Sequence, residues 1–320
     1  WSILKEFSMN IKSIKKTIII IPIYNPDNKF IQLLTMLKKQ KFVGFDLYII
    51  QTGQCRLDYK QYLDGFSHIV KCIKPEEFNH GRTRRLAALD CRDYEFLVYM
   101  AQGVVPANEF SIRNLLKCFN DSKVGCCFGR QVPNKDATPL AAFAREFNYP
   151  KKSCIMDIHD VKQYGIKTSF LSDTFAAYRN TALIAVGGFP DDVILGEDAV
   201  VASRMILSGW KKAYCAAAEV YHSHNYSIQQ EFKRYFDTGV FHGRNSWIRQ
   251  KFGRAEGEGK RYICNEYRYL LQNKKLYVIP RGIFTDLCKC IAYNLGKHEK
   301  WLPLSIKRKC TMSKYYWKRK

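Results

Sequence analysis

The sequence predicts an α/β protein in which a mostly parallel sheet is flanked by helices and followed by a smaller helical region. Short β-branched apolar runs alternate with amphipathic helical patterns between residues 17 and 119. From residue 228 onward, apolar residues recur at helical spacing. A chain of 320 residues can hold one large domain with an added region. We place an N-terminal extension at 1–16, the main domain at 17–227 and the helical region at 228–320.

The first half of the chain is predicted to alternate between strands and helices. Residues 17–23 are continuously apolar and β-branched, which is typical of a buried parallel strand. By the same patterns we expect strands at 45–50, 69–73 and 96–100, and helices at 30–40, 83–90, 108–119 and 139–147. Because ligands bind beyond the carboxyl ends of parallel strands, the candidate binding loops are those that follow Ile23, Ile50, Ile73 and Met100.

The chain is strongly basic, with a formal net charge of +23. Nucleic acid, an anionic membrane surface and phosphate-bearing substrates would each suit that charge. We exclude nucleic acid, because the positive charge is scattered and no motif that reads nucleic acid is present. The tail at 307–320 surrounds Tyr315, Tyr316 and Trp317 with basic residues and contains no acid. This pattern favours contact with an anionic membrane surface, and a solvated tail is the alternative.

The apolar runs and the cysteines of the sequence predict where in the cell the protein lies. No run approaches the ~20 apolar residues that span a bilayer, and early charges at Lys5 and Glu6 argue against a secretory signal. The twelve cysteines have irregular spacing and form no zinc motif, so we expect free thiols in a reducing cytoplasm. The predicted location is cytoplasmic, peripheral on the inner face of the cell membrane.

The most informative motif is Gly196-Glu197-Asp198, which follows a Gly-Gly-Phe-Pro turn at 187–190 and opens an apolar helical run. Two adjacent carboxylates repel each other, which raises the proton affinity of at least one of them and suits a general base. Carboxylates at a helix start are also ordinary partners of the helix dipole. The motif therefore gains its weight from the other motifs of the chain.

Taken in order, these motifs resemble the family 2 glycosyltransferases of the GT-A fold, and among them the bacterial rhamnosyltransferases of polysaccharide assembly. Besides the two motifs above, the matching segments are Ile21–Asn25, Phe78–Arg84, Gly129–Asn134, Phe143–Pro150, Tyr221–Tyr226 and Phe232–Asp237. The resemblance implies an inverting transferase that moves a sugar, with rhamnose as the candidate, from a nucleotide-diphosphate donor. The implied acceptor is a saccharide or lipid-linked saccharide in the assembly of a surface polysaccharide such as a capsule.

The resemblance also implies a role for each site residue. Asp198 is the expected general base for the acceptor hydroxyl, and Glu197 orients the acceptor or tunes Asp198. Asp173 and His224 are assigned to acceptor binding and His222 to a metal, and either histidine could instead meet the diphosphate. Helix capping explains Asp173 equally well, and a strand end explains the two histidines nearly as well. The expected nucleotide-binding residues are Pro22, Tyr24, Asn25, Gln51, His80, Arg84 and Gln102.

Two positions depart from the family pattern. Gln51 stands where the family has an aspartate that binds the nucleotide, and Gly103 stands where it has an aspartate that ligates Mg²⁺ or Mn²⁺. Since hard cations prefer carboxylate oxygens, metal binding should be weakened. We expect arginines of the segment 82–85 to compensate partly by clamping phosphate. The alternative is a catalytically impaired relative that acts through partner binding, against which the intact Gly-Glu-Asp motif argues.

Overall fold

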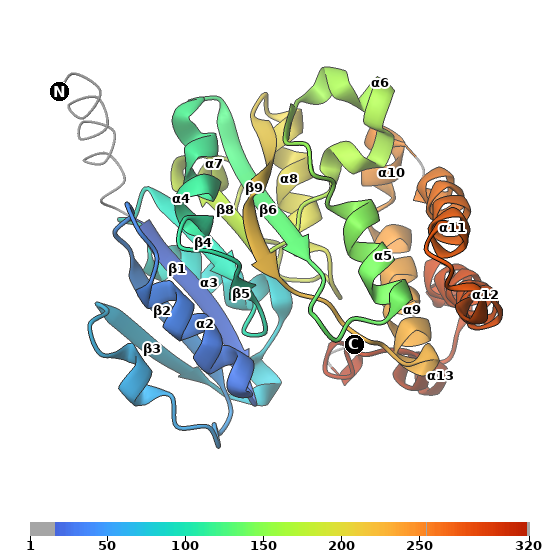
Figure 1. Cartoon of the computed structure of the whole chain (residues 1–320), viewed down its shortest axis with the longest axis horizontal. Helices are drawn as coiled ribbons and strands as arrows, with labels where there is room; N and C mark the ends of the chain where they lie inside the picture. The colour runs from blue at the N-terminus through green and yellow to red at the C-terminus, as the bar shows by residue number, and fades with distance from the viewer. Residues whose placement is uncertain (1–16, 254, 319–320) are drawn as a thin grey trace.

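The computed structural model describes residues 17–253 and 255–318, so the predicted extension at 1–16 lies outside the described residues. Its centre is a single sheet with strand order β3-β2-β1-β4-β8-β6-β9-β5, and β7 pairs with β9 (Figure 1). The strands are β1 (Thr17–Tyr24), β2 (Asp46–Thr52), β3 (His68–Ile73), β4 (Phe96–Met100), β5 (Val105–Pro106), β6 (Val124–Val132), β7 (Cys154–Met156), β8 (Phe175–Arg179) and β9 (Lys211–Tyr221).

The sheet has a parallel half and a mixed half. Strands β3, β2, β1 and β4 run parallel to one another, as predicted for this part of the chain. Strand β8 is antiparallel to both β4 and β6, β6 is parallel to β9, and β5 and β7 pair with β9 antiparallel. The α/β class is confirmed, and the second half of the sheet is more mixed than the sequence predicts.

Helices cover both faces of the sheet, and β1 shows how its residues divide between them. Ile19 and Ile21 pack with α2 (Asn28–Lys38) and α4 (Ser111–Leu116), whereas Ile18 and Ile20 belong to the core with α3 (His80–Asp90) and α8 (Glu197–Leu207). Both faces of a central strand are therefore buried, which explains its continuous apolar sequence. The remaining helices of this part are α5 (Pro139–Asn148), α6 (Val161–Tyr164) and α7 (Asn180–Ala185).

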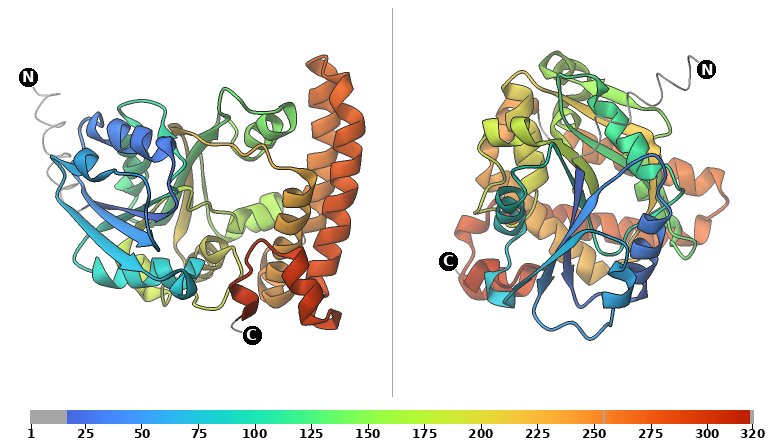
Figure 2. Two further views of the ribbon diagram at one scale, coloured as in Figure 1. Left: turned by 90° about the horizontal axis from the view of Figure 1, so that it is seen from below. Right: turned by 90° about the vertical axis from the view of Figure 1, so that its left-hand side faces the viewer.

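The C-terminal region is helical, as predicted. It comprises α9 (Ile228–Arg244), α10 (Ser246–Phe252), α11 (Ala255–Gln272), α12 (Ile279–Lys297) and α13 (Leu304–Cys310). Helix α12 packs along α9, and α11 and α12 form the outer edge of the molecule (Figure 2). Among the described residues, no helix is both long enough and apolar enough to cross a membrane.

The end of the chain is packed against the protein. Tyr316 is 7% exposed and Trp317 is 1% exposed, in a cluster with residues of α8, α9 and α10. Arg244 lies over the Trp317 ring, with its guanidinium carbon 5.3 Å from the ring centroid. These two aromatic side chains are therefore not available for the membrane contact that the sequence of the tail predicts.

Candidate active site

The start of α8 is set by Gly196. Its φ of +79° lies in the left-handed region, and a Cβ there would approach the ring of Phe241 to 2.8 Å. Glycine meets both demands, because it adopts positive φ without strain and has no side chain. The next two residues, Glu197 and Asp198, form the first turn of α8, where the helix dipole favours negative charge.

Helix α3 comes into contact with the turn that precedes α8. Asn79 caps α3 by accepting a hydrogen bond from the backbone N–H of Arg82 at 3.0 Å. A Cβ on Gly81 would lie 1.8 Å from the carbonyl oxygen of Pro190, so only glycine permits this approach. As a result, His80 and Arg84 of α3 lie beside Glu197.

Arg84 is the centre of a buried charge network. Its Nη1 lies 3.0 Å from Glu197 Oε1, and its Nε lies 2.8 Å from Asp173 Oδ2. The second contact is an ion pair, and neither of its two atoms has a hydrogen-bond partner among the described residues. The other Asp173 oxygen accepts a hydrogen bond of 2.5 Å from the Tyr178 hydroxyl. One guanidinium thus joins two carboxylates from distant parts of the chain.

The carboxyl groups in and beside this network differ in pKa. Burial alone would raise the pKa of Glu197, but Arg84 and His80 outweigh it and the pKa is lowered. Burial raises the pKa of Asp198 well above 3.8, and the charges of Glu197 and Asp173 add to this shift. Burial likewise raises the pKa of Asp173 to about 6, against the opposing charge of Arg84. Asp198 is therefore the carboxyl with the raised proton affinity of a general base.

Asp198 is held in place but is not fully enclosed. Its Oδ1 accepts a hydrogen bond of 2.8 Å from the Ala199 N–H, and its Oδ2 accepts one of 3.1 Å from the Asp173 N–H. Its side chain remains partly exposed, unlike that of Glu197. An oriented carboxylate with lone pairs left over can receive a proton from a bound hydroxyl group.

The predicted nucleotide-binding residues of the sheet lie at the carboxyl ends of its parallel strands. Pro22 and Tyr24 lie at the end of β1, with Asn25 directly after it. Gln102 follows β4 and bonds to Tyr24 twice, accepting from its N–H at 2.7 Å and donating to its carbonyl oxygen at 3.0 Å. Gln51 of β2 accepts from the Tyr59 hydroxyl and donates to the Gly53 carbonyl oxygen.

The two predicted histidines follow β9, and their rings contact each other. The ring centroids of His222 and His224 are 4.5 Å apart, and His222 Nδ1 lies 2.9 Å from Gln131 Oε1. Burial lowers the pKa of both rings, to about 4 for His224, and the nearby cations Arg145, Arg234 and Lys29 lower it further. Both imidazoles are therefore neutral at pH 7.

The residues at the expected metal position do not fit a divalent cation. Gly103 has no side chain, and both ends of the Gln102 amide are bonded to Tyr24. Both ends of the Gln51 amide are likewise taken. Within residues 17–253 and 255–318, no three His, Cys, Asp or Glu side chains are grouped to hold a metal ion. The Mg²⁺ or Mn²⁺ that the resemblance implies, with His222 as a ligand, therefore has no matching donor set.

The contacts of three predicted residues bear on their roles, which remain predictions. Arg84, predicted to bind the nucleotide, has its guanidinium paired with Glu197 and Asp173. Asp173, predicted to bind the acceptor, is buried and pairs with Arg84. Arg85 was expected to help compensate for a lost metal ligand, yet it pairs with Asp191 at 2.8 Å on the surface.

Known proteins with the same architecture are glycosyltransferases. A mannosyltransferase from Pyrobaculum calidifontis, solved with GDP-Man and Mn²⁺, superposes with a TM-score of 0.55 at 15% identity, covering 94% of this chain and 84% of its own. TarS of S. aureus superposes with a TM-score of 0.52 at 16% identity, covering 94% of this chain and 89% of its own. No protein-family model matches the chain. At these identities the superpositions show that the chain shares the GT-A fold.

The sequence relatives narrow this class. The O-antigen chain rhamnosyltransferase WbaN of Salmonella anatum is 43% identical over 300 residues, which are 93% of this chain and 95% of the relative. The O-antigen chain rhamnosyltransferase RfbN of Salmonella typhimurium is 41% identical over 302 residues, 94% of this chain and 96% of the relative. The chain belongs to the glycosyltransferase family that contains these two enzymes, and nothing favours the alternative of a pseudo-enzyme.

Proposed function

We propose that this glycosyltransferase moves rhamnose from a nucleoside-diphosphate donor to a saccharide acceptor, with inversion, during the assembly of a surface polysaccharide. The observation that carries the proposal is Asp198, a partly exposed, oriented carboxyl of raised pKa at the start of α8. The near-full-length identity to two rhamnosyltransferases supports the sugar and the pathway class.

The proposed reaction is a single displacement. The acceptor hydroxyl gives its proton to the Asp198 carboxylate while its oxygen attacks the anomeric carbon, and the bond from that carbon to the diphosphate oxygen breaks. The nucleoside diphosphate leaves with the bonding electrons. Glu197 and Asp173 act through Arg84: this salt-bridged network keeps negative charge near Asp198 and thereby keeps its proton affinity high.

A transfer assay tests this function directly. The full chain is incubated with a panel of nucleoside-diphosphate sugars, including dTDP-rhamnose and UDP-sugars, and with lipid-linked saccharide acceptors. We expect a product that contains rhamnose in inverted linkage. Transfer of a different sugar would overturn the donor assignment, and absence of any product with every donor would overturn the function.

The pH dependence of transfer is expected to follow Asp198. A general base works only when it is deprotonated, so the rate falls as the pH drops through its pKa. Because the pKa of Asp198 is raised well above 3.8, this loss should occur at a correspondingly higher pH. The measurement is kcat/KM against pH. A rate that persists down to the pKa of an ordinary carboxyl group would contradict the assignment.

We propose a cavity beside Asp198 for the acceptor. It has a volume of about 900 Å³ and lies between the edge of the sheet and helices α9 to α12. Its wall includes Ala199, next to the proposed base, and aromatic side chains such as Phe147, Phe170 and Tyr262. Aromatic rings offer flat apolar surfaces against which the apolar faces of a sugar ring can pack. The predicted acceptor residue His224 does not line this cavity.

We also propose that the chain attaches to an anionic membrane through α12, in addition to its basic tail. Helix α12 has its polar and apolar sides reversed: Asp286 and Lys289 are buried, while apolar side chains face outward. The exposed apolar residues are Ile283, Phe284, Leu287, Ile291 and Leu295, with Trp301 beyond the helix end at 86% exposure. We call these six residues the apolar edge. A contiguous apolar surface of this kind marks an interaction site.

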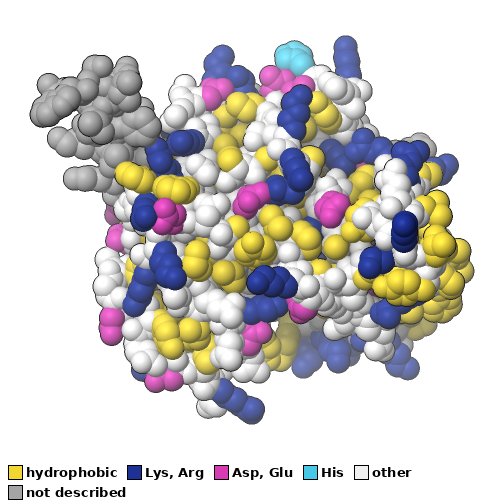
Figure 3. Space-filling view, in the orientation of Figure 1, with side chains coloured by type: hydrophobic (Ala, Val, Ile, Leu, Met, Phe, Trp, Pro, Cys, Tyr) yellow, Lys and Arg dark blue, Asp and Glu magenta, His cyan; other side chains and the backbone are white. Residues whose placement is uncertain are grey.

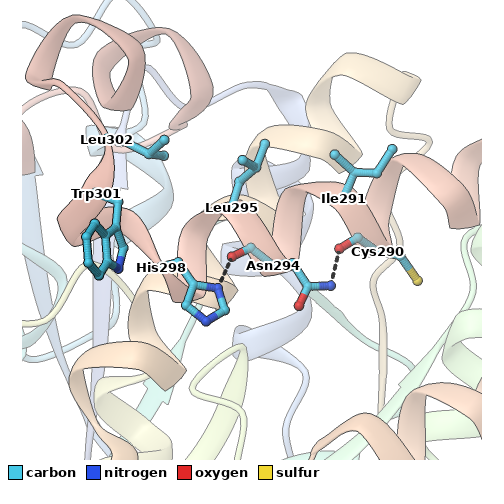
Figure 4. Close-up of a pocket in the computed structure, with 7 residues that line it drawn as sticks. All are labelled: Cys290, Ile291, Asn294, Leu295, His298, Trp301 and Leu302. Atoms are coloured by element: carbon cyan, nitrogen blue, oxygen red, sulfur yellow. Dashed lines mark hydrogen bonds between the residues drawn. The ribbon is translucent and has the colours of Figure 1, made fainter.

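Positive charge on the same side of the molecule supports a lipid surface as the partner. Figure 3 shows apolar side chains gathered where α11 and α12 lie, with Lys and Arg side chains around them. In Figure 4, Ile291, Leu295, Trp301 and Leu302 line a shallow hollow along α12 together with Asn294 and His298. Apolar side chains framed by cations match a bilayer with anionic headgroups, because the cations meet the headgroups while the apolar groups enter the acyl boundary.

Substitutions in the apolar edge should release the chain from vesicles. Each of Leu287→Glu and Ile291→Glu removes roughly 1.5–3 kcal/mol of burial, so the double variant should bind phosphatidylglycerol-containing vesicles at least tenfold more weakly. The control is Ile184→Glu on α7, a residue that is 60% exposed and lies outside this edge. The readout is cosedimentation. Unchanged vesicle binding would refute the proposal, as would a dimer in solution that the double variant dissociates.

A further inference from the structure

Positive charge gathers between the ends of β1 and β9, apart from the carboxylate network. Lys29 lies in the first turn of α2, next to the predicted nucleotide loop. Arg145 comes from α5 and Arg234 from α9. All three act electrostatically on the rings of His222 and His224, so they lie within electrostatic range of the two imidazoles. We call these five residues the cationic cluster.

Neutral partners hold the Arg145 side of the cationic cluster. Arg145 Nη1 donates a hydrogen bond of 2.5 Å to Gln131 Oε1, the same oxygen that lies 2.9 Å from His222 Nδ1. The Gln131 amide nitrogen donates to the hydroxyls of Tyr149 and Ser172. The Nε atom of Arg145 is buried and has no hydrogen-bond partner. A guanidinium that is fixed by amide and hydroxyl groups keeps its full positive charge for another ligand.

Aromatic rings hold the Arg234 side. The rings of His224 and Tyr226 stack with centroids 4.8 Å apart, and the guanidinium carbon of Arg234 lies 5.8 Å from the Tyr226 centroid. Arg234 also acts electrostatically on His80 of α3. The cationic cluster therefore extends from the predicted nucleotide loop toward the start of α3, which borders the catalytic carboxylates.

The cations of the cationic cluster have no carboxylate as an ion-pair partner among the described residues, and the one carboxylate that feels Arg234, Asp237, is itself bonded to Thr311. In the described parts of the chain, Lys29, Arg145 and Arg234 form no ion pair, whereas Arg84 and Arg85 are both paired with carboxylates. Like charges that are held close together in a partly desolvated place are unfavourable until an anion binds among them. Arginine forks match phosphate oxygens in geometry as well as charge.

We propose that the cationic cluster binds the diphosphate of the sugar donor directly and does the work that a carboxylate-bound cation does elsewhere in the fold. This inference rests on the proposed sugar transfer. Negative charge develops on the diphosphate oxygen as its bond to the anomeric carbon breaks, and the two guanidinium groups stabilise that charge. The proposal explains how the donor site can work although Gly103 and Gln102 offer no metal ligand.

Calorimetric titration with inorganic pyrophosphate in EDTA tests the proposal. We expect the full chain to bind it, and the double variant Arg145→Gln/Arg234→Gln to bind it at least about tenfold more weakly. The control is Lys151→Gln/Lys233→Gln, which removes the same charge from neighbouring positions outside the cationic cluster. Thermal unfolding of both variants verifies their fold. Equal affinity of the two double variants, or binding only when Mn²⁺ replaces EDTA, would overturn the proposal.

A gain-of-function variant provides a second test. A Cβ on Gly103 would meet nothing within 4 Å, so Gly103→Asp can restore the family carboxylate without displacing neighbours. We expect Mn²⁺ to strengthen dTDP or UDP binding at least tenfold in this variant, whereas the unchanged chain gains less than about twofold. A tenfold gain in the unchanged chain would contradict the inference.

The two proposals fail in different ways. Sugar transfer that requires Mn²⁺ would leave the function standing and remove the role of the cationic cluster. Pyrophosphate binding in EDTA through Arg145 and Arg234, without transfer from any donor, would support the role of the cationic cluster and overturn the proposed function.

Discussion

Replacing Asp198 with asparagine is expected to lower kcat for sugar transfer by roughly 100- to 10,000-fold, the range in which general bases contribute. The amide keeps the size of the side chain and an oxygen that can accept the Ala199 N–H hydrogen bond. It has no basic oxygen to receive the acceptor proton. Donor binding should be unchanged, because the cationic cluster that we assign to the diphosphate does not include Asp198.

The control for this variant is Asp191→Asn, in the same connection before α8. Asp191 is exposed and pairs with Arg85 on the surface, so its loss should leave transfer nearly intact. Stability provides a further check: Asp198 has a raised pKa, so losing its charge should not destabilise the fold. An Asp198→Asn enzyme with more than about a tenth of normal kcat would show that another group accepts the proton.

The elements with clear periodicity could be predicted from the sequence. The helix predicted at 30–40 is Asn28–Lys38, and the strand predicted at 96–100 has those bounds. These segments are bounded by turns or charged residues and pack within one half of the sheet. Strand β9, Lys211–Tyr221, escaped prediction because its inner residues are largely alanines and it carries no β-branched run.

The partners of individual charges could not be predicted. Sequence spacing places Arg84 in a loop that resembles a nucleotide-binding one, but only the fold brings Glu197 and Asp173 to its fork. Arg145 and Arg234 stand in motifs that supported the resemblance, yet no pattern along the chain indicates that they approach the same two histidines. The sequence likewise does not indicate which way the apolar residues of α12 face, and only packing shows that they point outward.

Replacing Arg84 with methionine is expected to destabilise the protein by about 3–5 kcal/mol, the usual result of removing one partner from a buried charge pair. Glu197 and Asp173 would remain buried without their counter-charge. Methionine fills similar apolar volume, so the loss measures charge more than packing. Urea unfolding gives the free energy. Arg85→Met is the matched control on the same helix, and its exposed pair with Asp191 should contribute at most about 1 kcal/mol.

A second substitution, at Glu197, distinguishes the effect of an unpaired charge on stability from the effect of lost packing. If Glu197 is costly because it is ionised and unpaired, Glu197→Gln should recover part of the stability lost in Arg84→Met while lowering stability in the unchanged protein, where it removes the partner of Arg84. Arg84→Lys is a further comparison. Lysine keeps the positive charge but cannot contact two carboxylates at once, as the guanidinium fork of arginine does. If the stability losses of Arg84→Met and Glu197→Gln were additive in the double variant, Arg84 would act through packing rather than charge. The raised proton affinity of Asp198 would then have to arise without the network that we describe.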